Sequence, residues 1–207
     1  MFTNLNKLKD IQLDLLKEVG NIGAGHAATA LSMMIKKQVD MKVPKVRIIP
    51  FNEIEEYLGG EEQIVVGIFL RVEGDVPGNM FFVFNTESAL RLLNYMLDKN
   101  ITDYQQLTEL DYSALSEIGN ILSGSYLSSL ADFTNLYLSP SVPSITIDMV
   151  GAILSFGLIQ ISQYSDAALV IDTTFFEGQS LVEGQFFLIP DPESFEKLFS
   201  ALGVLEE

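Results

Sequence analysis

The sequence is organised around a stretch that reads Asp14-Leu15-Leu16-Lys17-Glu18-Val19-Gly20-Asn21-Ile22-Gly23-Ala24-Gly25 and that occurs twice. The second copy reads Ser113-Ala114-Leu115-Ser116-Glu117-Ile118-Gly119-Asn120-Ile121-Leu122-Ser123-Gly124 and begins 99 residues after the first. Glu18, Gly20, Asn21, Ile22 and Gly25 recur as Glu117, Gly119, Asn120, Ile121 and Gly124. Pro44 and Pro143 each lie 23 residues after the asparagine of their copy. This shared register predicts an internal duplication with one polar site in each half.

The composition describes a foldable and acidic protein. Apolar residues make up 48% of the 207 residues and charged residues 19%, which is unlike a disordered chain. The net charge of −16 argues against nucleic acid or an anionic membrane as a partner, because both require clustered Lys and Arg. An acidic surface suits a protein partner that is basic or that presents a cation.

The sequence shows no clear targeting segment, membrane span or metal-binding motif. The first ten residues lack the apolar core of a signal peptide, and the longest uncharged apolar run, residues 149–161, is shorter than the roughly 20 residues that span a bilayer. We therefore expect a cytoplasmic protein without membrane insertion. The chain has no cysteine and a single histidine, His26, which leaves no zinc site and no histidine-centred triad. We expect no metal bound by this chain.

Two long helices are predicted to carry the repeated stretches. At 100° per residue, the helix over 10–36 has an inward face of Leu16, Val19, Gly20, Gly23, Ala27, Ala30 and Met34. Its opposite face has Asp14, Glu18, Asn21, Gly25 and Ser32. The helix over 110–133 has an inward face of Leu115, Ile118, Gly119, Leu122, Tyr126, Ser129 and Phe133.

The remaining pattern completes an α+β fold. We expect strands over 45–51, 63–73, 78–84, 144–147, 167–177 and 180–189. We expect helices over 52–58, capped by Asn52, over 86–97, capped by Thr86, over 148–161, opened by Asp148, and from Pro192 onward. Each half, about 10–97 and 109–203, then reads helix-strand-helix-strand-strand-helix. An isolated β-hairpin is only marginally stable in water. We therefore expect the strands of both halves to join one shared sheet in a single domain over 1–207.

The outward faces place a carboxylate one helical turn from a carboxamide. A glutamate can pair with a partner's cation, and an asparagine can hold a water with one donor and one acceptor. This is the task that glutamine performs in small GTPases. Gly25 and Gly124 follow one turn later, and glycine within a helix costs about 1 kcal/mol relative to alanine, which favours a contact there. A single Glu-x-x-Asn could be solvated surface, but its duplication favours a site.

One apparent motif has the wrong context. Residues 23–28, Gly-Ala-Gly-His-Ala-Ala, match a relaxed dinucleotide fingerprint, which requires a preceding strand. A helical pattern precedes it here, and the second copy lacks the first glycine. We therefore expect no nucleotide site, and we interpret His26 as a packing or solvent-facing residue.

The paired motif resembles the signature of the CheC/CheX/FliY family of chemotaxis phosphatases. That signature is Asp or Ser, three residues, Glu, two residues, Asn, and a proline about 22 residues later. Asp14, Glu18, Asn21 and Pro44 fit it, as do Ser113, Glu117, Asn120 and Pro143. The resemblance covers essentially the whole chain. Two motifs and no further flagellar-switch domain point to the CheC branch.

The resemblance implies hydrolysis of the phospho-aspartate on the response regulator CheY. Glu18 and Glu117 would pair with the regulator's lysine, Asn21 and Asn120 would orient the attacking water, and CheY would hold the Mg²⁺. Because the first motif position differs, Asp14 against Ser113, the two sites need not be equally active.

The family also implies the receptor deamidase CheD as a second partner. Asp148 and Met149 at the start of the apolar helix are the candidate docking residues, although that helix could instead belong to the core. Two motifs in one chain suggest a monomer. The alternative function is a non-catalytic adaptor that binds CheY or CheD.

Overall fold

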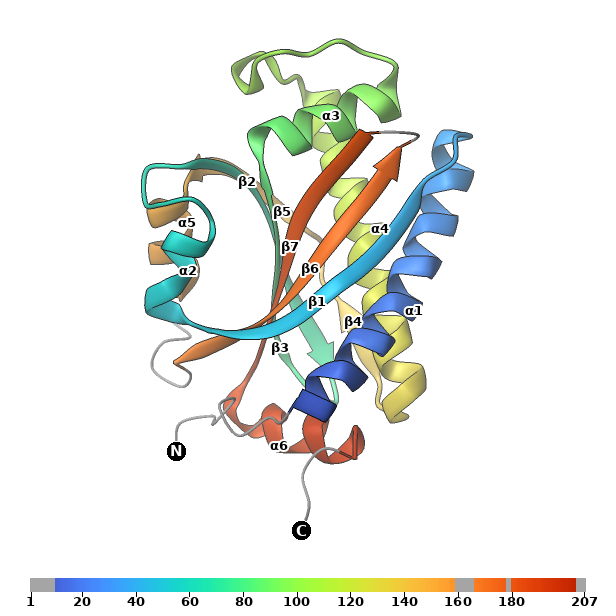
Figure 1. The fold of residues 1–207 in the computed structure, drawn as a ribbon, viewed down its shortest axis with the longest axis vertical. Coiled ribbons are helices and arrows are strands. Elements are labelled where there is room, and N and C mark those ends of the chain that lie inside the picture. Colours follow the sequence, from blue (N-terminus) through green and yellow to red (C-terminus); the bar gives the residue numbers. More distant parts are fainter. Residues whose placement is uncertain (1–9, 159–165, 178–179, 204–207) are drawn as a thin grey trace.

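The computed structural model describes residues 10–158, 166–177 and 180–203. A curled sheet forms the centre, and helices cover both of its faces (Figure 1). The first half supplies α1 (Asp10–Ile35), β1 (Asp40–Pro50), α2 (Phe51–Tyr57), β2 (Ile64–Gly74), β3 (Gly78–Asn85) and α3 (Thr86–Leu97). The second supplies α4 (Glu109–Thr134), β4 (Leu138–Pro140), β5 (Ser144–Met149), α5 (Val150–Leu158), β6 (Ala167–Glu177), β7 (Ser180–Pro190) and α6 (Pro192–Ala201). A 3-10 turn, Tyr104–Gln106, lies between the halves.

The two halves exchange strands within one antiparallel sheet. Among the described residues, the strand order is β1-β6-β7-β3-β2-β4, and β5 also pairs with β2. The first strand of each half therefore pairs with the other half, β1 with β6 and β4 and β5 with β2. The pair β3 and β7 lies at the centre. The α+β fold with a shared sheet is confirmed, and the sequence repeat corresponds to this near-symmetric order.

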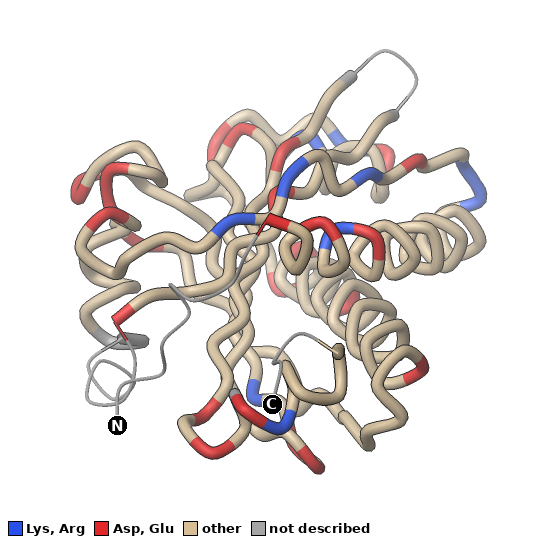
Figure 2. Tube along the Cα trace, turned by 60° about the horizontal axis from the view of Figure 1, so that its bottom comes forward, with Lys and Arg blue, Asp and Glu red and all other residues tan. Residues whose placement is uncertain are grey.

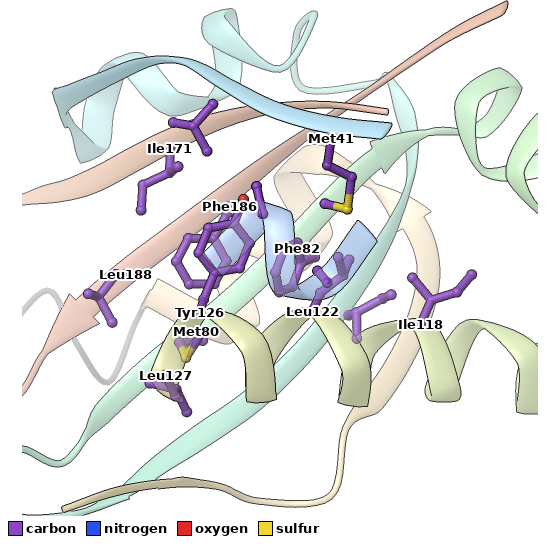
Figure 3. Close-up of a cluster of buried hydrophobic side chains, with 14 of the residues drawn as sticks. Met41, Met80, Phe82, Ile118, Leu122, Tyr126, Leu127, Ile171, Phe186 and Leu188 are labelled. Carbon is purple, nitrogen blue, oxygen red and sulfur yellow. The ribbon is translucent and has the colours of Figure 1, made fainter. Parts of the chain in front are cut away.

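The helices α1 and α4 lie side by side over one face of the sheet (Figure 1). They approach closely because a Cβ on Gly23 would lie only 3.1 Å from the Cα of Tyr126. The ring of Tyr126 stacks on Phe186 (Figure 3), with centroids 5.0 Å apart. Its hydroxyl lies 3.0 Å from the Thr173 hydroxyl. Burial raises the pKa of Tyr126 to about 12. This core fixes the two repeated helices relative to the sheet and to each other.

The opposite face of the sheet carries α2 and α5. A second apolar cluster fills this layer, with Ile54 of α2 and Val150 of α5 buried against Val83 and Phe187 of the sheet. Asp172 of β6 accepts hydrogen bonds from Arg47 of β1 and from the hydroxyl of Tyr57 at the end of α2. These bonds fasten α2 to the sheet.

Two helix starts differ from the sequence prediction. The expected cap Asn52 lies inside α2, which follows Pro50 directly and has no side-chain cap. Thr86 is the first residue of α3, and the cap is Asn85, whose side chain accepts a hydrogen bond from the Ser88 N–H at 2.7 Å. In both helices the predicted cap is a polar residue that lies one or two positions after the actual N-cap position, where its side chain has the same capping preference.

The expected helix over 148–161 is also wrong at its start. Asp148 and Met149 belong to β5, where they pair with Val65 and Ile64 of β2, and α5 begins at Val150. Residues 159–161 lie outside the described part of the chain. The inward faces of the long helices are largely confirmed, but Met34 and Phe133, near their ends, are exposed.

Candidate active sites on α1 and α4

Both repeated motifs present their acidic side chains to solvent. Glu18 on α1 and Glu117 on α4 are exposed, as are Asp14 and Ser113 at the first motif position. The buried side of each helix faces the sheet and the other helix. The structure therefore places the predicted carboxylates where a partner can reach them.

The two asparagines have different surroundings. Asn21 is half-buried, and its Oδ1 accepts a hydrogen bond from the Val43 N–H at 2.9 Å. Its Nδ2 donates to the Val43 carbonyl at 3.3 Å and to the Lys17 carbonyl at 3.0 Å. Asn120 is exposed, and within the described part of the chain its side chain has no hydrogen-bond partner. The same residue type is engaged in one half and open in the other.

The prolines of the motif occupy different environments. Pro44 follows Val43, at a point where the register of β1 on β6 shifts between Lys42 and Lys45. Pro143 lies between β4 and β5 and packs over α4, where a Cβ on Gly119 would come within 3.4 Å of it. Each proline marks an irregularity in the strand beside its site helix.

Two of the repeated glycines leave open space on the outward side. A Cβ added at Gly25 or at Gly124 would meet no atom within 4 Å outside its own helix. Internal packing therefore does not require glycine at either position, although glycine weakens a helix by about 1 kcal/mol. This agrees with the prediction that these positions give a partner close access to the helix backbone.

The acidic character predicted from the sequence extends over both site helices (Figure 2). The helix α4 contains Glu109, Asp111, Glu117 and Asp132 and no Lys or Arg, whereas α1 has Lys17 next to Glu18. Such faces attract a cationic group. Within residues 10–158, 166–177 and 180–203, no group of three or more His, Asp or Glu side chains could hold a metal ion.

The start of α4 is held by a capping box. Asp111 is buried, its Oδ2 accepts hydrogen bonds from the Thr108 N–H at 2.8 Å and hydroxyl at 2.6 Å, and its Oδ1 pairs with Lys99 at 2.6 Å. Burial would raise the pKa of Asp111, but Lys99 and Thr108 outweigh it and hold the pKa below its ordinary value of 3.8.

The candidate docking residues Asp148 and Met149 lie at the end of β5 and not on the site helices α1 and α4. Asp148 is exposed on β5, and its side chain accepts a hydrogen bond from the Met149 N–H at 2.8 Å. Met149 is 43% exposed, which is high for a large apolar side chain near the end of a strand. His26 is exposed, and its Nδ1 lies 3.4 Å from the Ser129 hydroxyl, as expected for a packing or solvent-facing residue.

Sequence reasoning did not single out the valines that precede the two prolines. Val43 is 1% exposed and holds Asn21, whereas Val142 is 84% exposed. The sequence repeat could have identified these valines, because the dipeptide Val-Pro recurs at 43–44 and 142–143 in the register of the repeat.

Two segments of the chain match one family of known proteins. The family model described as the CheC-like family matches residues 11–48 and 112–147, which contain both motifs and both prolines. The chain is 44% identical over 202 residues to the CheY-P phosphatase CheC of Bacillus subtilis, covering 96% of this chain and 97% of that protein.

Solved structures show the same fold at low sequence identity. The crystal structure of Thermotoga maritima FliY matches with a TM-score of 0.76 and 20% identity, over 95% of this chain and 98% of that one. The crystal structure of the CheX-CheY-BeF3-Mg+2 complex from Borrelia burgdorferi matches with a TM-score of 0.53 and 15% identity, over 82% of this chain and 95% of that one.

The fold, the duplicated motif and the comparison with known proteins thus define an internally duplicated α+β protein of the chemotaxis phosphatase class. More specifically, the chain belongs to the CheC-like family. Among the described residues, no helix combines the length and the hydropathy needed to cross a bilayer.

Proposed function

We propose that this protein is a hydrolase that removes the phosphoryl group from the phospho-aspartate of the response regulator CheY. The observation that carries the proposal is the pair of exposed glutamates, each about one helical turn before an asparagine, which is followed one turn later by a glycine with open space. The support from relatives is the 44% identity to a protein named CheY-P phosphatase CheC.

In the proposed reaction, this chain positions the regulator and the attacking water. Glu18 or Glu117 pairs with the lysine of the regulator, which aligns the two proteins. The asparagine of the same motif holds a water through its carbonyl and amide groups, in line with the acyl phosphate. The water oxygen forms the new P–O bond as the bond between phosphorus and the aspartyl oxygen breaks. The products are a free aspartate carboxylate and inorganic phosphate.

Any Mg²⁺ in this reaction belongs to the regulator. The described residues of this chain offer no cluster for a metal ion, and the structural neighbour from Borrelia burgdorferi was solved as a CheX-CheY complex with BeF3 and Mg²⁺. A metal on the partner neutralises charge that develops on the phosphoryl oxygens.

The test is the decay of phosphorylated CheY in the presence of the protein. Wild type should accelerate the decay, and Asn21→Ala combined with Asn120→Ala should remove that acceleration, because no carboxamide remains to orient water. A double variant that accelerates decay as well as wild type does would overturn the proposal.

A second candidate function is binding to the receptor deamidase CheD. The observation that favours a second docking surface is that Asp148 and Met149, the last two residues of β5 before α5, are both exposed. Asp148→Lys should weaken the complex with CheD in a titration while the decay of phosphorylated CheY stays as fast. Unchanged CheD affinity would remove this surface from consideration.

The alternative of a non-catalytic adaptor makes an opposite prediction. An adaptor binds CheY or CheD tightly and leaves the decay of phosphorylated CheY at its intrinsic rate. Measuring affinity and decay on one preparation, which we expect to be monomeric, separates the two functions.

A further inference from the structure

Two polar side chains of the helix α1 bond the backbone at the outer edge of β1, one at Val43 within the strand and one at Val39 just before it. Within the described residues β1 pairs with β6 alone, so its other edge has no strand partner. Asn21 bonds both the N–H and the carbonyl of Val43. Ser32, three turns along the helix, accepts from the Val39 N–H at 2.9 Å and donates to the Val39 carbonyl at 3.3 Å.

These four hydrogen bonds satisfy the backbone groups of Val43 and Val39 on the edge that β6 does not pair. An uncovered edge presents unpaired N–H and C=O groups, which are costly when buried and prone to pairing with other chains. Val39 and Val43 are both buried, so their backbone groups need partners inside the protein. Asn21 and Ser32 supply these partners, and we call the four bonds the β1 seal.

The β1 seal consumes the donor capacity of Asn21. A carboxamide has two N–H donors and two acceptor positions. One N–H of Asn21 faces the Lys17 carbonyl and the other faces the Val43 carbonyl, while the Oδ1 retains one free acceptor position. In the proposed mechanism the asparagine holds the water through both its carbonyl and its amide, which requires a free donor and a free acceptor. Asn21 lacks the donor while the seal is closed.

Among the described residues of the second half, no equivalent seal is present. The counterpart of Val43 is Val142, which is exposed, and the nearby Ser141 bonds the backbone of Arg71 on β2 instead of α4. The counterpart of Ser32 is Ala131, which has no polar side chain. Asn120 therefore keeps both N–H groups and its carbonyl for another molecule.

We propose that the two motifs have different tasks: Asn120 orients water in the working site, and Asn21 closes the edge of β1, so that the first site stays inactive while the seal is closed. This inference rests on the proposed phosphatase function and assigns it to one of the two copies. Glu18 remains exposed on the first copy, so that copy can still bind a cationic partner.

The experiment compares single variants in the phosphorylated CheY assay and in thermal unfolding. Asn120→Ala should slow the accelerated decay at least about tenfold more than Asn21→Ala does. Glu117→Gln should likewise outweigh Glu18→Gln, and this second pair leaves the seal untouched because neither glutamate takes part in it. The midpoint of unfolding should fall by about 2–4 °C for Asn21→Ala and stay unchanged for Asn120→Ala.

Ser32→Ala is the matched control for stability. It removes the other half of the seal and lies outside both motifs, so it should lower the midpoint as Asn21→Ala does while the decay of phosphorylated CheY remains at the wild-type rate. All rates are measured at a temperature where every variant is folded by circular dichroism.

Three results would overturn the inference. Equal losses from Asn21→Ala and Asn120→Ala, or a larger loss from Asn21→Ala, assign activity to the first copy. An unchanged unfolding midpoint for Asn21→Ala would show that the β1 seal does not stabilise the protein. If the variant that lacks both asparagines is as fast as wild type, the proposed function itself fails, which is a different outcome from two equal single losses.

Discussion

The helix α1 lies beside one continuous strand, whereas α4 lies beside an interrupted one. β1 runs over 11 residues with a single register shift near Pro44. The equivalent segment of the second half is divided into β4, with three residues, and β5, with six, and Pro143 lies between them. The two copies of the motif therefore lie beside strands of different backbone structure.

This difference shows how a duplicated site can diverge without losing its sequence signature. In the first half the pre-proline valine is buried and its backbone binds the motif asparagine. In the second half the pre-proline valine is exposed, and the proline packs toward Gly119 instead. The residues of the motif are retained, but the strand decides which of them are free. Four predictions test this comparison.

The largest difference is expected at the two valines. Val43→Ala should lower the free energy of unfolding by about 2–3 kcal/mol, because it removes buried methyl groups and leaves a cavity beside α1. Val142→Ala should change it by less than about 0.5 kcal/mol, because that side chain faces solvent. Urea unfolding of both variants measures the difference. Equal losses would mean that the two strands support their helices alike.

The second prediction concerns Gly20 and Gly119, the equivalent glycines on the inward faces of α1 and α4. A Cβ on Gly119 would lie 2.7 Å from Ile68 Cγ2, so Gly119→Ala should cost about 1–3 kcal/mol through overpacking. A Cβ on Gly20 would lie 3.4 Å from Val43 Cγ2, an ordinary contact, so Gly20→Ala should be close to neutral. Thermal unfolding of the two variants gives the comparison, and a greater loss for Gly20→Ala would reverse it.

Much of this architecture could be predicted from the sequence. The repeat identified two equivalent helices, and their period of 3.6 residues separated the buried face from the face that carries Glu18 and Glu117. Alternating apolar residues located the strands of the shared sheet. These features follow from local patterns, which the sequence displays directly.

Features that depend on distant pairing could not be predicted in this way. Asp148 has the local signal of a helix start, but pairing with Val65 of β2 extends β5 through it. Asn21 was predicted to project toward a partner, and its engagement with Val43 depends on where β1 lies beside α1. The same motif gave no sign that Asn120 would be free, because that depends on a break in the neighbouring strand.

The third prediction is a smaller effect and concerns the outward glycines Gly25 and Gly124. Gly25→Ala and Gly124→Ala should each raise the free energy of unfolding by up to about 1 kcal/mol, because alanine favours the helix and its Cβ meets open space. If a regulator contacts the helix backbone at these positions, the substitution raises the KM for phosphorylated CheY with little change in kcat.

The effect of these glycines on KM sharpens the comparison between the two copies. With Asn120 in the working site, Gly124→Ala should raise KM more than Gly25→Ala, although both variants gain similar stability. A rise in KM for Gly25→Ala alone would place productive docking on α1.

The last prediction is confined to acid pH and concerns the start of α4. The pKa of Asp111 is held below 3.8 in the folded protein, so at pH values just below 3.8 the unfolded state binds this proton more readily. Its stabilising contribution is therefore complete above that pH and is lost as the pH falls through the folded pKa. The equivalent position on α1 is Gln12, which does not titrate, so this acid sensitivity belongs to the second helix.

Acid unfolding of Asp111→Asn tests this assignment. The variant loses the charge pairing with Lys99 and should be less stable at neutral pH, but its stability should fall less steeply on acidification than that of wild type. Asp75→Asn is the matched control, because the pKa of Asp75 is also lowered, by its hydrogen bonds from Lys197 and the Tyr137 N–H, outside both site helices. The contrary result is that Asp75→Asn makes the free energy of unfolding depend less steeply on acid pH, while Asp111→Asn leaves that dependence as steep as in wild type. The titration of Asp111 would then not govern the stability of α4.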